Sequence, residues 1–230
     1  MEILWHGLSF VEVKGKTDGQ PVVIAINPFD ESVGLKPSRV KANIVILSST
    51  PSPAEKKKIA KSIGADGPFF VEEAGEYEKQ GVKMRGLDNF YRQKESGKLV
   101  KNIIFKTELE KIKICALGNF KGDSIPPDIL ESILGIDILL IPIGGGATIS
   151  SKEAVKIISQ IEPKIVIPVN YLPSSIKSSS ESKGLKINLE DEKNFLKNFG
   201  AKDKEKIEKL KIKTDELQRE GTELVLIEMT

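Results

Sequence analysis

The sequence predicts an α/β protein with layered sheets, and two features of its hydrophobic pattern support this class. Short runs rich in β-branched residues alternate with turn signals through the first half, which is typical of strands. Two later segments, Ile136–Pro142 and Lys164–Val169, are almost continuously apolar, as expected of strands buried on both faces. The remaining predicted strands are Ser9–Lys14, Val22–Asn27, Asn43–Ser48, Pro68–Glu72, Val82–Leu87, Val100–Lys106, Ile112–Leu117 and Glu223–Glu228.

Helix start signals stand between these strands. Ser52, Pro53 and Glu55 supply an N-cap, a first-turn proline and a capping-box acid, and Gly64 follows at the expected end. A second capping box precedes a segment in which apolar residues recur at the spacing of one helix face. Its residues are Ser150, Glu153, Ala154, Ile157, Ile158 and Ile161, and two further helices are predicted over Pro127–Leu134 and Glu190–Phe199.

The length of 230 residues suits one domain, which we place over residues 1–230. Residues 172–184 are rich in serine, and this composition predicts a flexible surface loop. Cys115 is the single cysteine, so an intramolecular disulfide is excluded and a reducing compartment is expected. No signal-peptide pattern and no apolar run of roughly 18 residues is present, so we expect a cytoplasmic protein without a membrane partner.

The charge balance argues against a polyanionic partner. Thirty-five basic residues face 33 acidic ones, which leaves a net charge of +2. Only Arg39, Arg85, Arg92 and Arg219 are arginines, the residue best suited to bidentate phosphate and base contacts. We therefore expect no nucleic-acid partner, and a small molecule or a protein is the expected ligand.

The histidine count limits metal chemistry. Catalytic zinc sites take about three protein ligands, mostly histidine. This chain has one histidine, His6, and Cys115 lies more than a hundred residues away. The composition therefore predicts that no zinc cofactor is bound.

Several ordered segments resemble the metallo-β-lactamase superfamily, in particular its small predicted zinc-dependent hydrolases near the ascorbate-phosphate lactonases. The resemblance extends over nearly the whole chain, in segments 74–82, 137–145, 154–168 and 184–187. It implies a four-layer αββα sandwich of two mixed β-sheets, with a metal site at the strand ends.

The positions that match the family's metal ligands have all changed. Where relatives have His-x-His-x-Asp-His after the third strand, this chain has Ser49, Pro51, Pro53 and Ala54. Ala116 and Asn119 stand in place of the His and Asp of His-Leu-Gly-Asp, and Asn170 in place of the His of Met-His-Tyr. The early Gly-His-Ser turn is Gly7-Leu8-Ser9, and Asp-Pro-Phe is Asn27-Pro28-Phe29. None of the replacements at the main ligand positions has a thiolate, imidazole or carboxylate.

We therefore interpret the chain as a pseudoenzyme that keeps the hydrolase sandwich for binding or scaffolding and has no catalytic residues. A residual pocket is predicted at Ser49, Thr50, Asn119 and Asn170. The alternative is a metal-dependent hydrolase with rearranged oxygen ligands such as Asp30 or Asp123. Metal-independent catalysis at Ser49 lacks a visible base and ranks below both.

Other reactive residues have simpler interpretations. His6 has no evident catalytic partner, and Cys115 is predicted to be a buried, inert thiol that points away from the mapped site. Residues 144–146, all glycine, lack the dinucleotide-binding spacing and are predicted to form a tight turn. The carboxylates Asp30, Glu31, Glu73, Glu76 and Asp123 show no spacing that predicts convergence.

Overall fold

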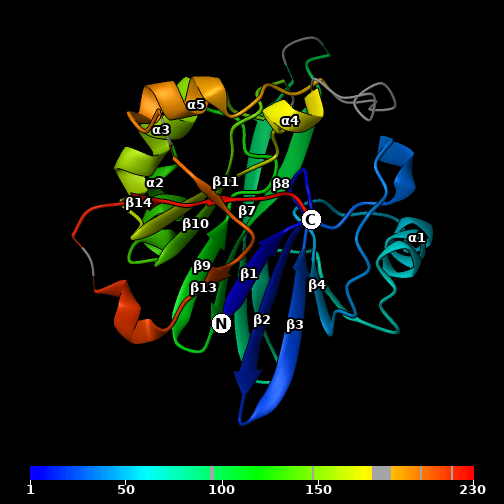
Figure 1. The fold of residues 1–230 in the computed structure, drawn as a ribbon. Coiled ribbons are helices and arrows are strands. Elements are labelled where there is room, and N and C mark those ends of the chain that lie inside the picture. The colour runs from blue at the N-terminus through cyan, green and yellow to red at the C-terminus, as the bar shows by residue number, and fades with distance from the viewer. Residues whose placement is uncertain (94–95, 147, 178–187, 203, 219) are drawn as a thin grey trace.

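The computed structural model describes residues 1–93, 96–146, 148–177, 188–202, 204–218 and 220–230. Two β-sheets pack face to face between helices (Figure 1). Helix α1 (Pro53–Ile63) lies on one side of the pair, and α2 (Pro127–Ile133), α3 (Ser151–Ile161) and α5 (Lys193–Phe199) lie on the other. Within the described residues, no helix is both long and apolar enough to cross a membrane.

The first sheet has six strands in the order β13-β1-β2-β3-β4-β5. Their bounds are β13 Leu210–Lys211, β1 Glu2–Trp5, β2 Val11–Thr17, β3 Gln20–Ile26, β4 Ile44–Ile46 and β5 Phe69–Val71. Strands β1, β2 and β3 pair in antiparallel fashion, whereas β3, β4 and β5 run parallel. The sheet is therefore mixed, and the carboxyl ends of its three parallel strands meet at one edge.

The second sheet has seven strands in the order β14-β11-β10-β9-β8-β7-β6. Their bounds are β14 Glu223–Leu224, β11 Ile165–Val169, β10 Ile138–Pro142, β9 Ile112–Ala116, β8 Leu99–Leu109, β7 Val82–Arg92 and β6 Gly75–Lys79. Strands β9, β10, β11 and β14 are parallel, and β6, β7, β8 and β9 are antiparallel. A separate two-stranded sheet pairs β12 (Lys206–Ile207) with β15 (Leu226–Ile227).

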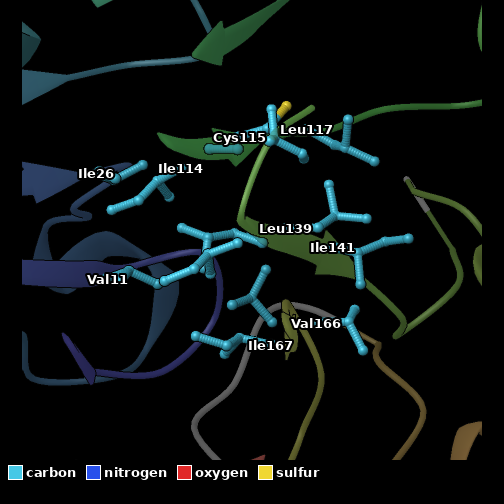
Figure 2. Close-up of a cluster of buried hydrophobic side chains, with 14 of the residues drawn as sticks. Val11, Ile26, Ile114, Cys115, Leu117, Leu139, Ile141, Val166 and Ile167 are labelled. Carbon is cyan, nitrogen blue, oxygen red and sulfur yellow. The ribbon is translucent and has the colours of Figure 1, made fainter. Parts of the chain in front are cut away.

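The core lies between the sheets and is mostly isoleucine, valine and leucine. One continuous cluster of buried side chains includes members of both sheets. Figure 2 shows Val11 and Ile26 of the first sheet near Ile114, Leu139 and Ile167 of the second. Full burial of each such aliphatic side chain contributes about 1.5–3 kcal/mol, so this cluster is the main source of stability.

Both predicted capping boxes are present. Ser52 caps α1 and Ser150 caps α3, each with the glutamate three residues later, and Gly64 ends α1 in the left-handed conformation. The strands β7 and β8 are longer than predicted, because their charged outer ends hide the alternating pattern. Strands β1, β6, β12 and β13 were not predicted. Within the predicted flexible loop, Ser174–Lys177 forms a short helix, α4, and residues 178–184 lie outside the described part of the chain.

Candidate functional site

The carboxyl ends of the parallel strands in both sheets lie at one edge of the sandwich, and sharp turns follow several of them. Asn27 follows β3 with φ 48°, Gly118 follows β9 with φ 62°, and Asn170 follows β11 with φ 52°. Leu8, in the turn between β1 and β2, also has a positive φ of 48°. Asparagine and glycine adopt this left-handed conformation with little strain, whereas leucine does not. We call this edge the cleft edge.

The four predicted pocket residues lie in the turns around the cleft edge and differ in exposure. Ser49, Thr50 and Asn119 are exposed, whereas Asn170 is half-buried. The Asn170 backbone N–H donates to Leu8 O at 2.6 Å, and its side-chain Nδ2 lies 3.4 Å from Thr148 Oγ1. Asn170 is therefore held by neighbouring loops, and none of the four residues lines the hollow between Asn27 and Gly118.

A hollow does exist at the cleft edge, but it is very small. Its volume is about 10 Å³, and its lining residues are Ser9, Ile26, Asn27, Ala116, Gly118, Leu140 and Val169. A cavity needs roughly 10–15 Å³ to hold one water molecule. No organic ligand fits there, and a ligand of this edge has to bind at its exposed rim.

The loop that follows β4 is organised as a helix start. Ser52 N and Ser52 Oγ donate to Glu55 Oε2 at 2.7 and 2.6 Å, and Glu55 N donates back to Ser52 Oγ at 3.3 Å. Pro53 and Ala54 lie exposed in the first turn of α1. The only carboxylate in residues 47–55 is thus engaged in capping the helix.

The residues at the cleft edge do not fit a transition metal. Serine, proline, alanine and asparagine occupy the matched positions, and none of them offers an anionic or imidazole donor. Across the described residues, no group of three or more His, Cys, Asp or Glu side chains is arranged to hold a metal ion.

The acidic residues named as alternative ligands are dispersed. Asp30 accepts a hydrogen bond from Ser32 N at 2.8 Å and so caps a short 3-10 helix. Asp123 is exposed and lies 3.6 Å from Lys156 Nζ. Glu73 pairs with Lys101, and Glu76 pairs with Arg85. Among the described residues, no three of Asp30, Glu31, Glu73, Glu76 and Asp123 are arranged to hold one metal ion.

The comparison with protein families settles the class. The family model described as "Beta-lactamase superfamily domain" matches residues 2–170. The chain belongs to this superfamily. The predicted αββα sandwich is confirmed, because this superfamily has two mixed sheets of the kind seen in Figure 1.

Curated relatives of this metallo-β-lactamase-fold chain belong to the UPF0173 group. A protein of Thermococcus onnurineus, named UPF0173 metal-dependent hydrolase, is 26% identical over 175 residues, which cover 64% of this chain and 76% of that protein. A UPF0173 protein of Pyrococcus abyssi is 43% identical over 51 residues, or 22% of this chain and 24% of the relative. The match to the second protein therefore spans only about a quarter of its length.

Solved structures of other proteins have the same fold. A crystal structure from Thermotoga maritima, assigned as a zinc-dependent hydrolase of the metallo-β-lactamase superfamily, is 27% identical, covers 98% of this chain and 97% of that one, and has a TM-score of 0.72. Igni18, a metallo hydrolase of Ignicoccus hospitalis, is 14% identical and has a TM-score of 0.57. The match covers 87% of this chain and 90% of that one, and it shows that the two proteins share a fold. These names support the hydrolase alternative better than a non-catalytic protein, but they do not test the ligand positions of this chain.

Leu8 is a buried residue of the turn between β1 and β2. It stands at the matched histidine position, is 7% exposed, and belongs to a cluster of buried apolar residues. The other members of that cluster include Phe10, Phe29, Leu47, Leu172 and Leu189. Leucine in the left-handed conformation is strained, so the packing of its buried side chain in this cluster must offset that strain.

His6 has partners that the sequence did not indicate. Its Nε2 lies 3.0 Å from Glu12 Oε2 and its Nδ1 lies 2.9 Å from Thr230 Oγ1, and both His6 and Glu12 side chains are 6% exposed. Burial raises the pKa of the Glu12 carboxyl, but hydrogen bonds from His6 and Lys14 outweigh burial and hold that pKa below its ordinary value. Glu12 lies between two valines of a strand, and no spacing rule marks such a residue as buried.

Cys115 is buried and residues 144–146 form a tight turn, as the sequence predicts. Cys115 is fully buried, and burial raises the pKa of its thiol to about 12. The turn at 144–146 closes on itself, since Gly145 N donates to Ile149 O and Thr148 N donates to Gly145 O, both at 3.1 Å. A Cβ atom on Gly144 would lie 2.2 Å from Asn170 O, so close packing explains the glycine there.

Proposed function

We propose that this chain is a metal-independent member of the metallo-β-lactamase superfamily, folded as one domain over residues 1–230, that binds a ligand or protein at the rim of the cleft edge. The donor set at the strand ends is the observation that supports this proposal. Ser49, Ala116 and Asn170 supply neither an anionic nor an imidazole donor, and the capping box of α1 uses the nearby carboxylate of Glu55. Without a bound metal, no group at this edge lowers the pKa of a water or polarises a carbonyl.

The size of the hollow bears on the kind of ligand. Because about 10 Å³ admits at most one water, the proposed ligand contacts exposed residues such as Ser49, Thr50 and Asn119. The nearly balanced charge disfavours nucleic acid and anionic membranes as the partner. A protein surface or a small molecule held at the rim fits these properties.

Metal content tests the proposal directly. Protein purified without chelator is expected to hold far less than one zinc, iron or manganese ion per chain by elemental analysis. The melting temperature is expected to be the same with and without EDTA, because a metal bound only to the folded state would raise it by mass action. Near-stoichiometric metal together with a chelator-dependent melting temperature would refute metal independence.

The relatives' printed names support a second candidate, a hydrolase with a rearranged oxygen-ligand site. Its test is turnover of generic lactone, phosphodiester and β-lactam substrates in the presence of magnesium or manganese. Activity that survives repurification and is lost in Asp123→Ala would favour this candidate. Asp66→Ala is the matched control, since Asp66 lies before β5, at the opposite end of that strand from the cleft edge.

A further inference from the structure

A continuous series of hydrogen bonds joins the two sheets at the cleft edge. Ser48 N donates to Asn27 Oδ1 at 2.7 Å, and Asn27 Nδ2 donates to Ser48 Oγ at 3.1 Å. Ser48 O in turn accepts from Ile103 N at 2.9 Å. This path leads from the end of β3, through the residues that follow β4, into β8 of the other sheet.

Asn102 extends the path to the end of β9. Its Nδ2 donates to Leu117 O at 3.0 Å, and its Oδ1 accepts from Asn119 N at 2.8 Å. Asn102 is 1% exposed, so both amide atoms are satisfied by backbone groups in a buried environment. We refer to Asn27, Ser48 and Asn102 with these backbone contacts as the polar bridge.

Gly118 shows how tightly the two sides of the polar bridge approach each other. A Cβ atom there would lie 2.3 Å from Ser48 Cβ and Oγ and 2.7 Å from Asn102 Oδ1. The end of β9 therefore packs directly against the residue that follows β4. The hollow beside this contact has room for one water at most.

We propose that the polar bridge cross-links the strand ends at the place where the superfamily site would require a metal, so that the cleft edge is held together by neutral amides. This inference rests on the proposed metal independence. Its physical basis is that a buried network in which every member is satisfied orders its surroundings, whereas loss of one member leaves buried groups unpaired. The bridge connects β3, the end of β4, β8 and the end of β9, so its loss should loosen both sheets together.

Two isosteric substitutions test the polar bridge as a matched pair. In Asn102→Asp, a carboxylate oxygen would face Leu117 O without a proton to donate, and we expect the melting temperature at pH 8 to fall by roughly 6–12 °C. In Asn27→Asp, the second oxygen can accept from the Ser48 hydroxyl, so we expect a fall of less than about 3 °C. Once protonated, the carboxyl introduced by Asn102→Asp can donate to Leu117 O, so the loss in this variant should shrink at pH 5. A pH-independent loss would contradict the assigned donor.

Hydrogen exchange of Asn102→Asp at pH 8 separates a cross-link from a local contact. We expect the amides of Ser48 and Ile103, as well as Asn119, to exchange at least about 10-fold faster relative to the wild type. Amides of the β2–β3 hairpin near Thr17 should change far less. Faster exchange restricted to Asn119 would overturn the proposal, because it would show that Asn102 does not support the first sheet.

Metal analysis of the same samples keeps the two proposals apart. Stoichiometric metal in the wild type would refute metal independence whatever the exchange data show. Low metal with exchange changes confined to Asn119 would refute only the polar bridge.

Discussion

Two buried polar clusters of this molecule differ in the kind of groups they contain. The polar bridge at the cleft edge consists of neutral amides, a hydroxyl and backbone groups. The cluster around His6 contains the only imidazole of the chain, the Glu12 carboxylate and the Lys14 ammonium, which lies 3.1 Å from Glu12. Its titratable groups lie beside Thr230 and next to the turn that contains Leu8, since His6 N donates to Phe10 O at 2.8 Å. This difference predicts that the stability contributed by the His6 cluster depends on pH, whereas the stability contributed by the polar bridge depends on close packing.

The largest effect is expected from Gly118→Ala, which disrupts the neutral cluster. The added Cβ would overlap Ser48 at 2.3 Å, and alanine is strained at a φ of 62°. We expect a loss of about 2–5 kcal/mol in the free energy of unfolding, measured by chemical denaturation. Gly19→Ala is the control, because Gly19 also has a positive φ but a Cβ atom there would meet nothing within 4 Å. Equal losses in both variants would mean that backbone strain alone is responsible.

Glu12→Gln probes the charged cluster. The pKa of the Glu12 carboxyl is lowered in the folded state. The ionised carboxylate therefore contributes stability above the ordinary pKa of 4.5, and this stability is lost as the pH falls through the pKa of the folded state. We expect the variant to be less stable than the wild type by about 1.5–3 kcal/mol at pH 7. The difference should narrow toward zero as the pH falls below 4.5. Urea denaturation from pH 7 to pH 3 measures it, and a constant difference would argue against an ionised Glu12.

A smaller effect is expected at the start of α1, in the loop that follows β4. Ser52→Ala removes the N-cap of α1 and should cost about 1 kcal/mol, within the usual range for a lost cap. Ser150→Ala removes the equivalent cap of α3 and provides the comparison. Similar losses in urea denaturation would show that the loop after β4 acts as an ordinary helix start. A gain in stability with Ser52→Ala would point instead to a strained, functional loop.

Sequence pattern predicted the fold well, because the information was local or periodic. The capping boxes of α1 and α3 and the apolar runs of β10 and β11 each depend on residues within one or two turns or along one strand. The sequence pattern does not reveal the short strands β1 and β13, since the pairing of Glu2 with Lys211 joins residues far apart in the chain.

The site was predicted only in part, because its contacts also join residues that are far apart in the chain. The sequence shows that the strand ends carry few anionic or imidazole side chains, but it does not show how the groups present there pair with one another. Asn102 gave one usable signal, an amide directly before the apolar run Ile103–Phe105. Its partners Leu117 and Asn119 follow a different strand, so only the assembled sheets reveal the contact.

The position of Cys115 has a practical consequence for all of these measurements. Cys115 belongs to the cluster of buried apolar side chains and is fully buried, and burial raises the pKa of its thiol to about 12. The thiolate that reacts with disulfide and maleimide reagents is therefore scarce in the folded protein. Since Cys115 is the only cysteine, the rate of thiol modification reports how often the interior opens. The modification rate of Cys115 therefore measures opening of the sandwich, and the measurement requires no added label or engineered residue.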